Sequence, residues 1–114
     1  MRWTGGLMLA AMLAMPVSAQ EIDAETDQAL WCATALTMLD QMGAYPVEAE
    51  NVVAVTRIWY RKAFNGLDRL GVGDDEIDVV SQSYIDELGM QLPDYLISSD
   101  EDALRLNIHA CFEP

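Results

Sequence analysis

The sequence predicts an all-α fold: a small four-helix bundle closed by one disulfide between its first and last helices. Large apolar residues recur with helical spacing along the chain, and no segment keeps the period-2 alternation of a strand. The only two cysteines fall on the predicted inward faces of the first and last helices. These observations together favour antiparallel helices joined by short loops.

The N-terminus has the pattern of a secretory signal peptide. Arg2 gives a positive start, residues 5–15 form a short apolar stretch, and Val17 and Ala19 place small residues before a cleavage site. We therefore expect residues 1–19 to be removed and residues 20–114 to form a single helical domain in the periplasm or outside the cell. The apolar stretch is shorter than a membrane span, so no stable membrane anchor is expected after cleavage.

The mature chain is strongly acidic. The full sequence holds 6 Lys and Arg residues against 19 Asp and Glu residues. Residues 1–19 carry only Arg2 among these, so cleavage leaves five basic residues against 19 acidic ones, a formal net charge of −14. Such a charge disfavours nucleic acid and anionic membrane surfaces as partners.

The first predicted helix is the centre of the fold. Asp23 is suited to cap its free amides, and Gly43 is suited to end it. One apolar arc predicts a single buried face, formed by Trp31, Cys32, Ala35, Met38, Leu39 and Met42.

Three further helices are predicted. After a turn at Tyr45–Pro46, the second runs from about Val47 to Gly66, with Leu67 and Leu70 either prolonging it or forming a packed loop. The third opens at residues 74–76 and stops at Gly89, and residues 90–97, which hold Pro93, form a connection either without regular structure or with one helical turn. The fourth starts at residues 98–101, where Ser98 and Glu101 have capping-box spacing, and buries Leu104, Ile108 and Cys111.

Cys32 and Cys111 are predicted to form the disulfide. An even cysteine count in an exported chain indicates a structural bridge, and only one pairing is possible. The bridge would close nearly the whole mature chain and stabilise it by about 4 kcal/mol in the chain-entropy model. A redox-active role is the alternative, which the absence of a Cys-x-x-Cys motif disfavours.

Positive charge gathers on the second predicted helix. Four of the five mature basic residues lie within thirteen positions: Arg57, Arg61, Lys62 and Arg69. Two guanidinium groups beside aromatic residues suit a carboxylate or phosphate on a partner, so Arg57, Ile58, Arg61 and Lys62 are candidate partner-binding residues. The alternative is that these cations pair with the protein's own carboxylates.

No catalytic, metal or cofactor site is predicted. The acidic clusters at residues 74–78 and 100–102 begin predicted helices and lack the ligand pattern of an EF-hand, so capping explains them better than a metal does. His109, the only histidine, is interpreted as a surface residue with no nucleophile beside it in the sequence. The chain is therefore not expected to be an enzyme.

In outline, but in no motif, the chain resembles small exported bacterial helical proteins, among them acid-stress periplasmic chaperones and disulfide-tied immunity proteins. No functional residue carries over from this resemblance. Two hypotheses follow: a non-catalytic protein-binding or inhibitory module, or an acid-activated periplasmic stress chaperone whose 19 carboxylates are neutralised below about pH 4. A homodimer through Ile58, Val79 or Leu106 is a further hypothesis.

Overall fold

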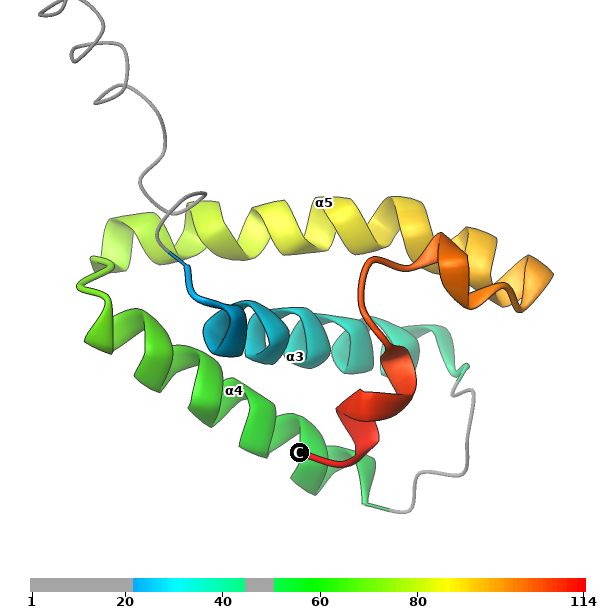
Figure 1. The fold of residues 1–114 in the computed structure, drawn as a ribbon, viewed down its shortest axis with the longest axis horizontal. Coiled ribbons are helices and arrows are strands. Elements are labelled where there is room, and N and C mark those ends of the chain that lie inside the picture. The colour runs from blue at the N-terminus through cyan, green and yellow to red at the C-terminus, as the bar shows by residue number, and fades with distance from the viewer. Residues whose placement is uncertain (1–21, 45–50) are drawn as a thin grey trace, which may run out of the picture.

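The computed structural model describes residues 22–44 and 51–114, and these ranges are helical without a strand. Three α-helices are followed by two 3₁₀ turns: α3 (Ala24–Met42), α4 (Val52–Arg69), α5 (Asp74–Ser98), η1 (Glu101–Ala103) and η2 (Ile108–Phe112). Figure 1 shows α3 between α4 and α5, with the C-terminal segment crossing one face of α3. The predicted signal peptide, residues 1–19, lies outside the described residues, as do the predicted turn at Tyr45–Pro46 and the helix start at Val47.

Helix α3 is the core of the fold, as the sequence predicts. Helices α4 and α5 and the η2 turn all pack on it, whereas α4 and α5 make few contacts with each other. The helix is buried on more than one face, because Ala29, Ala33 and Leu36 are as inaccessible as Trp31 and Cys32. The prediction of a single buried face was therefore too narrow, and Met42 is 44% exposed. A helix with neighbours on several sides is expected to be apolar nearly all round.

The ends of α3 follow the predicted capping chemistry. The Asp23 carboxylate accepts a hydrogen bond from the Thr26 amide at 2.9 Å, and Gly43 ends the helix with a φ of 67°. That left-handed conformation is open to glycine without steric cost. The predicted bounds of this helix are confirmed.

Helix α4 continues past Gly66 to Arg69, which is one of the two alternatives that the sequence left open, and Leu67 in this extension is fully buried. Gly66 of α4 lies directly against Thr26 of α3. A Cβ atom added at Gly66 would lie 2.2 Å from the Thr26 Oγ1 atom, so only glycine fits this crossing without a shift of its neighbours.

The predicted stop of the third helix at Gly89 is wrong. Helix α5 runs through Gly89 and Pro93 to Ser98. The buried stripe of this helix continues beyond the predicted stop and consists of Val80, Tyr84, Leu88, Leu92 and Tyr95. Burial of Leu92 and Tyr95 against the core outweighs the local cost of proline and glycine, which sequence signals alone count as breakers.

The predicted fourth α-helix does not form. In place of the predicted four-helix bundle, the described residues form three α-helices followed by a C-terminal strap of two 3₁₀ turns. We call residues 99–114 the strap. Ser99 is in the left-handed region with a φ of 58°, and the Asp100 and Asn107 side chains accept hydrogen bonds from the amides of Asp102 and His109. These local bonds compete with a continuous helix. The predicted capping box does not form, because the Ser98 hydroxyl accepts a hydrogen bond from the Asp100 amide instead of the Glu101 amide and donates to the Asp94 carbonyl.

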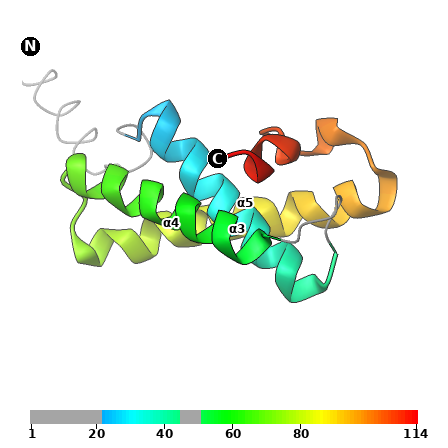
Figure 2. The same ribbon diagram turned by 90° about the horizontal axis from the view of Figure 1, so that it is seen from below.

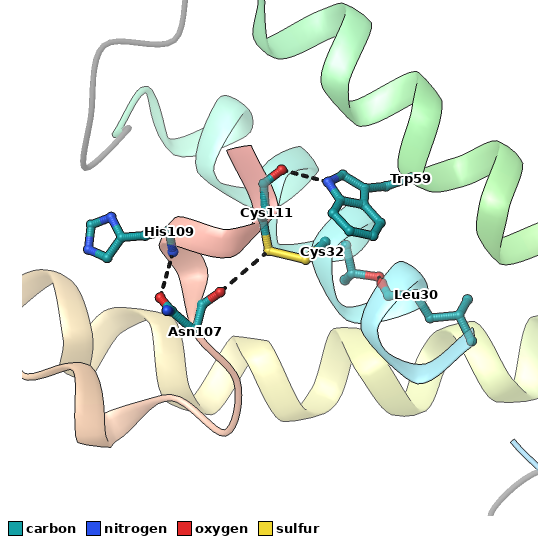
Figure 3. Close-up of a disulfide and its surroundings, with 7 residues drawn as sticks. Leu30, Cys32, Trp59, Asn107, His109 and Cys111 are labelled. Carbon is teal, nitrogen blue, oxygen red and sulfur yellow. Dashed lines mark hydrogen bonds between the residues drawn. A yellow bond between two sulfur atoms is a disulfide. The ribbon is translucent and has the colours of Figure 1, made fainter. Parts of the chain in front are cut away.

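The disulfide joins Cys32 and Cys111 as predicted, with Cα atoms 5.2 Å apart and a sequence separation of 79. It connects α3 to the η2 turn instead of to a fourth α-helix. Beside it, the Trp59 indole N–H donates a hydrogen bond to the Cys111 carbonyl, so α4 also holds the strap (Figure 3). Leu104 and Ile108 of the strap are buried in the core.

Candidate functional site

The basic residues of α4 divide into two sets in the structure. Arg69 forms an ion pair with Asp23 at 3.0 Å and also approaches the Thr26 hydroxyl. Lys62 places its ammonium 4.9 Å from the centroid of the Trp59 ring. For Arg69 the prediction of an internal carboxylate partner is confirmed, and Lys62 has an internal aromatic partner.

Arg57 and Arg61 behave differently. Both side chains are exposed, and neither forms an ion pair within the part of the chain that the structure describes. They lie one turn apart on one edge of α4, whereas Ile58 and Lys62 are each about 100° further round the helix. The predicted partner-binding residues Arg57, Ile58, Arg61 and Lys62 therefore spread over an arc of about 140° on α4. Ile58 is half-buried, and the free cations are Arg57 and Arg61.

A groove runs beside this edge of α4. We call it the α3 groove: a hollow of about 200 Å³ with a floor on α3 and walls on α4 and α5. Its lining residues are Leu30, Ala33, Thr34, Thr37, Met38 and Gln41 on the floor, Tyr60 and Phe64 on α4, and Ser81 and Ile85 on α5. The α3 groove exists because α4 and α5 both pack on α3 and scarcely on each other.

The walls of the α3 groove are held in place by side-chain contacts. The hydroxyls of Thr37 and Tyr60 share a hydrogen bond at 3.0 Å, and the Tyr60 and Phe64 rings stack with centroids 6.0 Å apart. Phe64 remains 47% exposed and Ile85 43% exposed, facing each other across the groove. Exposed apolar side chains gathered on a concave surface are typical of a protein interaction site.

A second hollow of about 320 Å³ adjoins the α3 groove and shares Thr37 and Tyr60 with it. Arg57 lines this hollow together with Val53 of α4. Arg57, Arg61 and Phe64 are spaced i, i+4 and i+7, so they share one edge of α4. The arginines therefore form a cationic rim along an apolar groove.

A charged cluster that the sequence did not indicate anchors the strap. The Arg105 guanidinium donates to both Asp27 carboxylate oxygens at 2.8 and 2.9 Å and to Glu87 at 2.6 Å. The Tyr84 hydroxyl donates to the same Asp27 at 2.6 Å. Burial raises the pKa of Asp27, but the hydrogen bonds from Arg105 and Tyr84 outweigh burial, so the pKa lies below its usual value. We call these four residues the strap clamp.

The other sequence candidates have structural roles. Glu76 in the first turn of α5 accepts a hydrogen bond from the Gly73 amide at 3.1 Å, which confirms the capping interpretation there. Within residues 22–44 and 51–114, no group of three or more His, Cys, Asp or Glu side chains is arranged to hold a metal ion. The His109 ring lies 3.4 Å from a Glu101 carboxylate oxygen on the strap.

No protein-family model, curated protein or solved structure matches this chain. Among the described helices, none combines the length and the apolar character needed to cross a membrane.

The sequence located Arg57 and Arg61 but not the α3 groove. The groove depends on Phe64 and Ile85, which are 21 positions apart in the sequence and line the same hollow only because α4 and α5 flank α3. The available signal was the aromatic pair Tyr60 and Phe64 on the same edge as the two arginines.

Proposed function

We propose that the domain is a non-catalytic protein-binding or inhibitory module, exported to the periplasm or beyond, which binds its partner at the α3 groove. One observation carries the proposal: the exposed apolar walls at Phe64 and Ile85 lie beside Arg57 and Arg61, two cations without an ion pair in the described ranges. Elsewhere on α4, cations are used internally. Arginine beside exposed aromatic rings is enriched at protein interfaces.

The groove lining supports binding more than chemistry. It offers three hydroxyls on Thr34, Thr37 and Ser81 and the phenol of Tyr60, with no carboxylate, imidazole or amine among its lining residues. A nucleophile needs an adjacent base to become reactive at neutral pH. The lining is therefore suited to contacting side chains of another protein.

Affinity capture tests this proposal. The bait is the oxidised mature domain at pH 7, and the sample is the extracellular or periplasmic fraction of the native organism. The test variant is Arg57→Gln with Arg61→Gln, and the matched control is Met90→Glu with Ile97→Glu, which makes the same change in net charge at two exposed positions of α5 that do not line the groove.

We expect one stoichiometric partner to bind the wild type and the control but to be lost from the test variant. Capture that is undiminished by the arginine changes would contradict the groove as the binding site. A bait that retains no partner would contradict the binding module itself.

The strap clamp supports a second candidate, the acid-activated stress chaperone. Arg105 holds the strap in place through the carboxylates of Asp27 and Glu87. The strap in turn covers the apolar core with the buried side chains of Leu104 and Ile108. Protonation of Asp27 in acid would weaken this hold on the strap while the disulfide keeps the strap tethered. Suppression of a client's aggregation near pH 3 but not at pH 7 would support this candidate, and no protection at any pH would exclude it.

A further inference from the structure

We infer that the partner occupies the α3 groove with an amphipathic α-helix that carries carboxylates along the flank facing α4. The inference rests on the proposed binding function and adds the class of partner.

The shape of the groove fits a helix. Its floor residues on α3 follow the spacing i, i+3, i+4, i+7, i+8 and i+11 from Leu30 to Gln41, although Leu30 and Ala33 at one end are only 5% and 1% exposed. The accessible floor from Thr34 to Gln41 is roughly 10 Å long at 1.5 Å per residue, which matches about two turns of a partner helix. Short side chains at Thr34 and Thr37 allow a second helix to approach closely.

The groove lies where a bundle would place its missing helix. Leu30 and Gln41 are each about half a turn around α3 from Cys32, which bonds to the strap. The strap thus covers one face of α3, as the two views of the ribbon show, and α4 and α5 flank the opposite face without closing over it (Figures 1 and 2). A helix laid between α4 and α5 would complete the four-helix arrangement that the chain's own fourth segment does not supply.

The charges on the two walls of the groove determine which flank of the partner helix faces α4. Arg57, which lines the adjoining hollow, and Arg61 lie one turn apart on the edge of α4 beside the groove, so Asp or Glu residues spaced i and i+4 on the partner can pair with both. On the α5 side, Asp78 is spaced i and i+3 with Ser81 of the groove wall and is exposed. A helix with carboxylates toward α4 and Lys or Arg toward α5 therefore complements both walls and has one preferred orientation.

The test uses a designed peptide of about 15 residues with a leucine stripe, Glu on one flank and Lys on the other. The first comparison peptide has Gln in place of Glu, and the second has the same composition in scrambled order. Affinity is measured by titration calorimetry against the oxidised wild-type domain, the Arg57→Gln/Arg61→Gln variant and the Met90→Glu/Ile97→Glu control.

We expect the Glu peptide to bind the wild type and the control about fivefold more tightly than the Gln peptide, as two exposed ion pairs allow. This preference should disappear in the arginine variant. The scrambled peptide should not bind. Ile85→Glu should abolish binding, and amide chemical-shift changes in the unmodified domain should concentrate at Ala33, Thr34 and Thr37 even if that variant fails to fold.

Three results would overturn the inference: no peptide binding, equal affinity for the Glu and Gln peptides, or shift changes away from the groove. If a second copy of the domain occupied the groove, sedimentation would show a concentration-dependent dimer. If another part of the same chain occupied the groove, the peptide would not bind. Either result contradicts a partner helix.

The two proposals can fail separately. If the native partner is captured but its footprint lies outside the groove, the binding function stands and the helix inference falls. If the peptide binds as expected but no native partner is captured, the groove's preference stands and the proposed function falls.

Discussion

Replacing Gly66 by alanine tests the close crossing of α3 and α4, which sets the position of the groove's α4 wall. The added methyl group would lie 2.2 Å from the Thr26 Oγ1 atom and 2.9 Å from its Cγ2 atom. Thr26 is 1% exposed and β-branched, so its side chain has little freedom to move aside. The two helices must separate or Thr26 must change rotamer.

The magnitude follows from two opposing effects. Overpacking a tight contact costs about 1–3 kcal/mol. Alanine is a better helix former than glycine by about 1 kcal/mol, which offsets part of that cost. We expect a net loss of about 1–2 kcal/mol in the free energy of unfolding, measured by urea denaturation followed by circular dichroism with the disulfide intact.

Gly89 provides the matched control. It is helical and exposed, and an added Cβ atom meets nothing within 4 Å outside its own helix backbone. Gly89→Ala should therefore stabilise the protein by about 0.5–1 kcal/mol. The double variant Thr26→Ala/Gly66→Ala should recover part of the loss, because it leaves only the 3.0 Å contact with the Cβ atom of residue 26. Equal stability of Gly66→Ala and Gly89→Ala would refute the close crossing.

Three further predictions concern the strap and α5. Because the pKa of Asp27 is depressed in the folded state, its contribution to stability is full above its unfolded pKa of about 4 and is lost as the pH falls through the lower folded pKa. Asp27→Asn should flatten the fall of stability below about pH 4 in acid titrations, and an unchanged slope would contradict the clamp with Arg105. Replacing Cys32 and Cys111 by alanine should lower the unfolding free energy by about 4 kcal/mol in denaturant melts, whereas an unchanged midpoint would contradict a closed bridge. Leu92→Ala should cost about 2–5 kcal/mol, because Leu92 is fully buried; a cost typical of a surface position would contradict the extension of α5 through Pro93.

The sequence predicted well what depends on local chemistry. Asp23 and Gly43 carry strong capping signals, and both ends of α3 lie where those signals place them. The disulfide was predictable because two cysteines allow only one pairing. The all-α class followed from the spacing of apolar residues.

The errors arose where tertiary contacts overrule local signals. Gly89 and Pro93 indicate a helix end, but the burial of Leu92 and Tyr95 keeps α5 intact to Ser98. In the strap, the side chains of Asp100 and Asn107 bind nearby amides and favour short 3₁₀ turns, which apolar spacing alone cannot distinguish from a helix.

The α3 groove depends on the relative placement of three helices, which no single segment encodes. Arg57 and Arg61 were identifiable from the sequence because they are cations beside aromatic residues. Their separation from Arg69 and Lys62 required the structure, since it depends on the positions of Asp23 and Trp59.

Photo-crosslinking from the groove tests the central claim most directly. A benzoylphenylalanine at position 64 replaces one exposed aromatic side chain by another, and the same group at position 94 on the exposed outer side of α5 serves as control. In the native periplasmic or extracellular fraction at pH 7, we expect position 64 to crosslink to one protein through a helical segment and position 94 to give no such product. Crosslinking from position 94 alone, or from neither position, would contradict the α3 groove as the binding site.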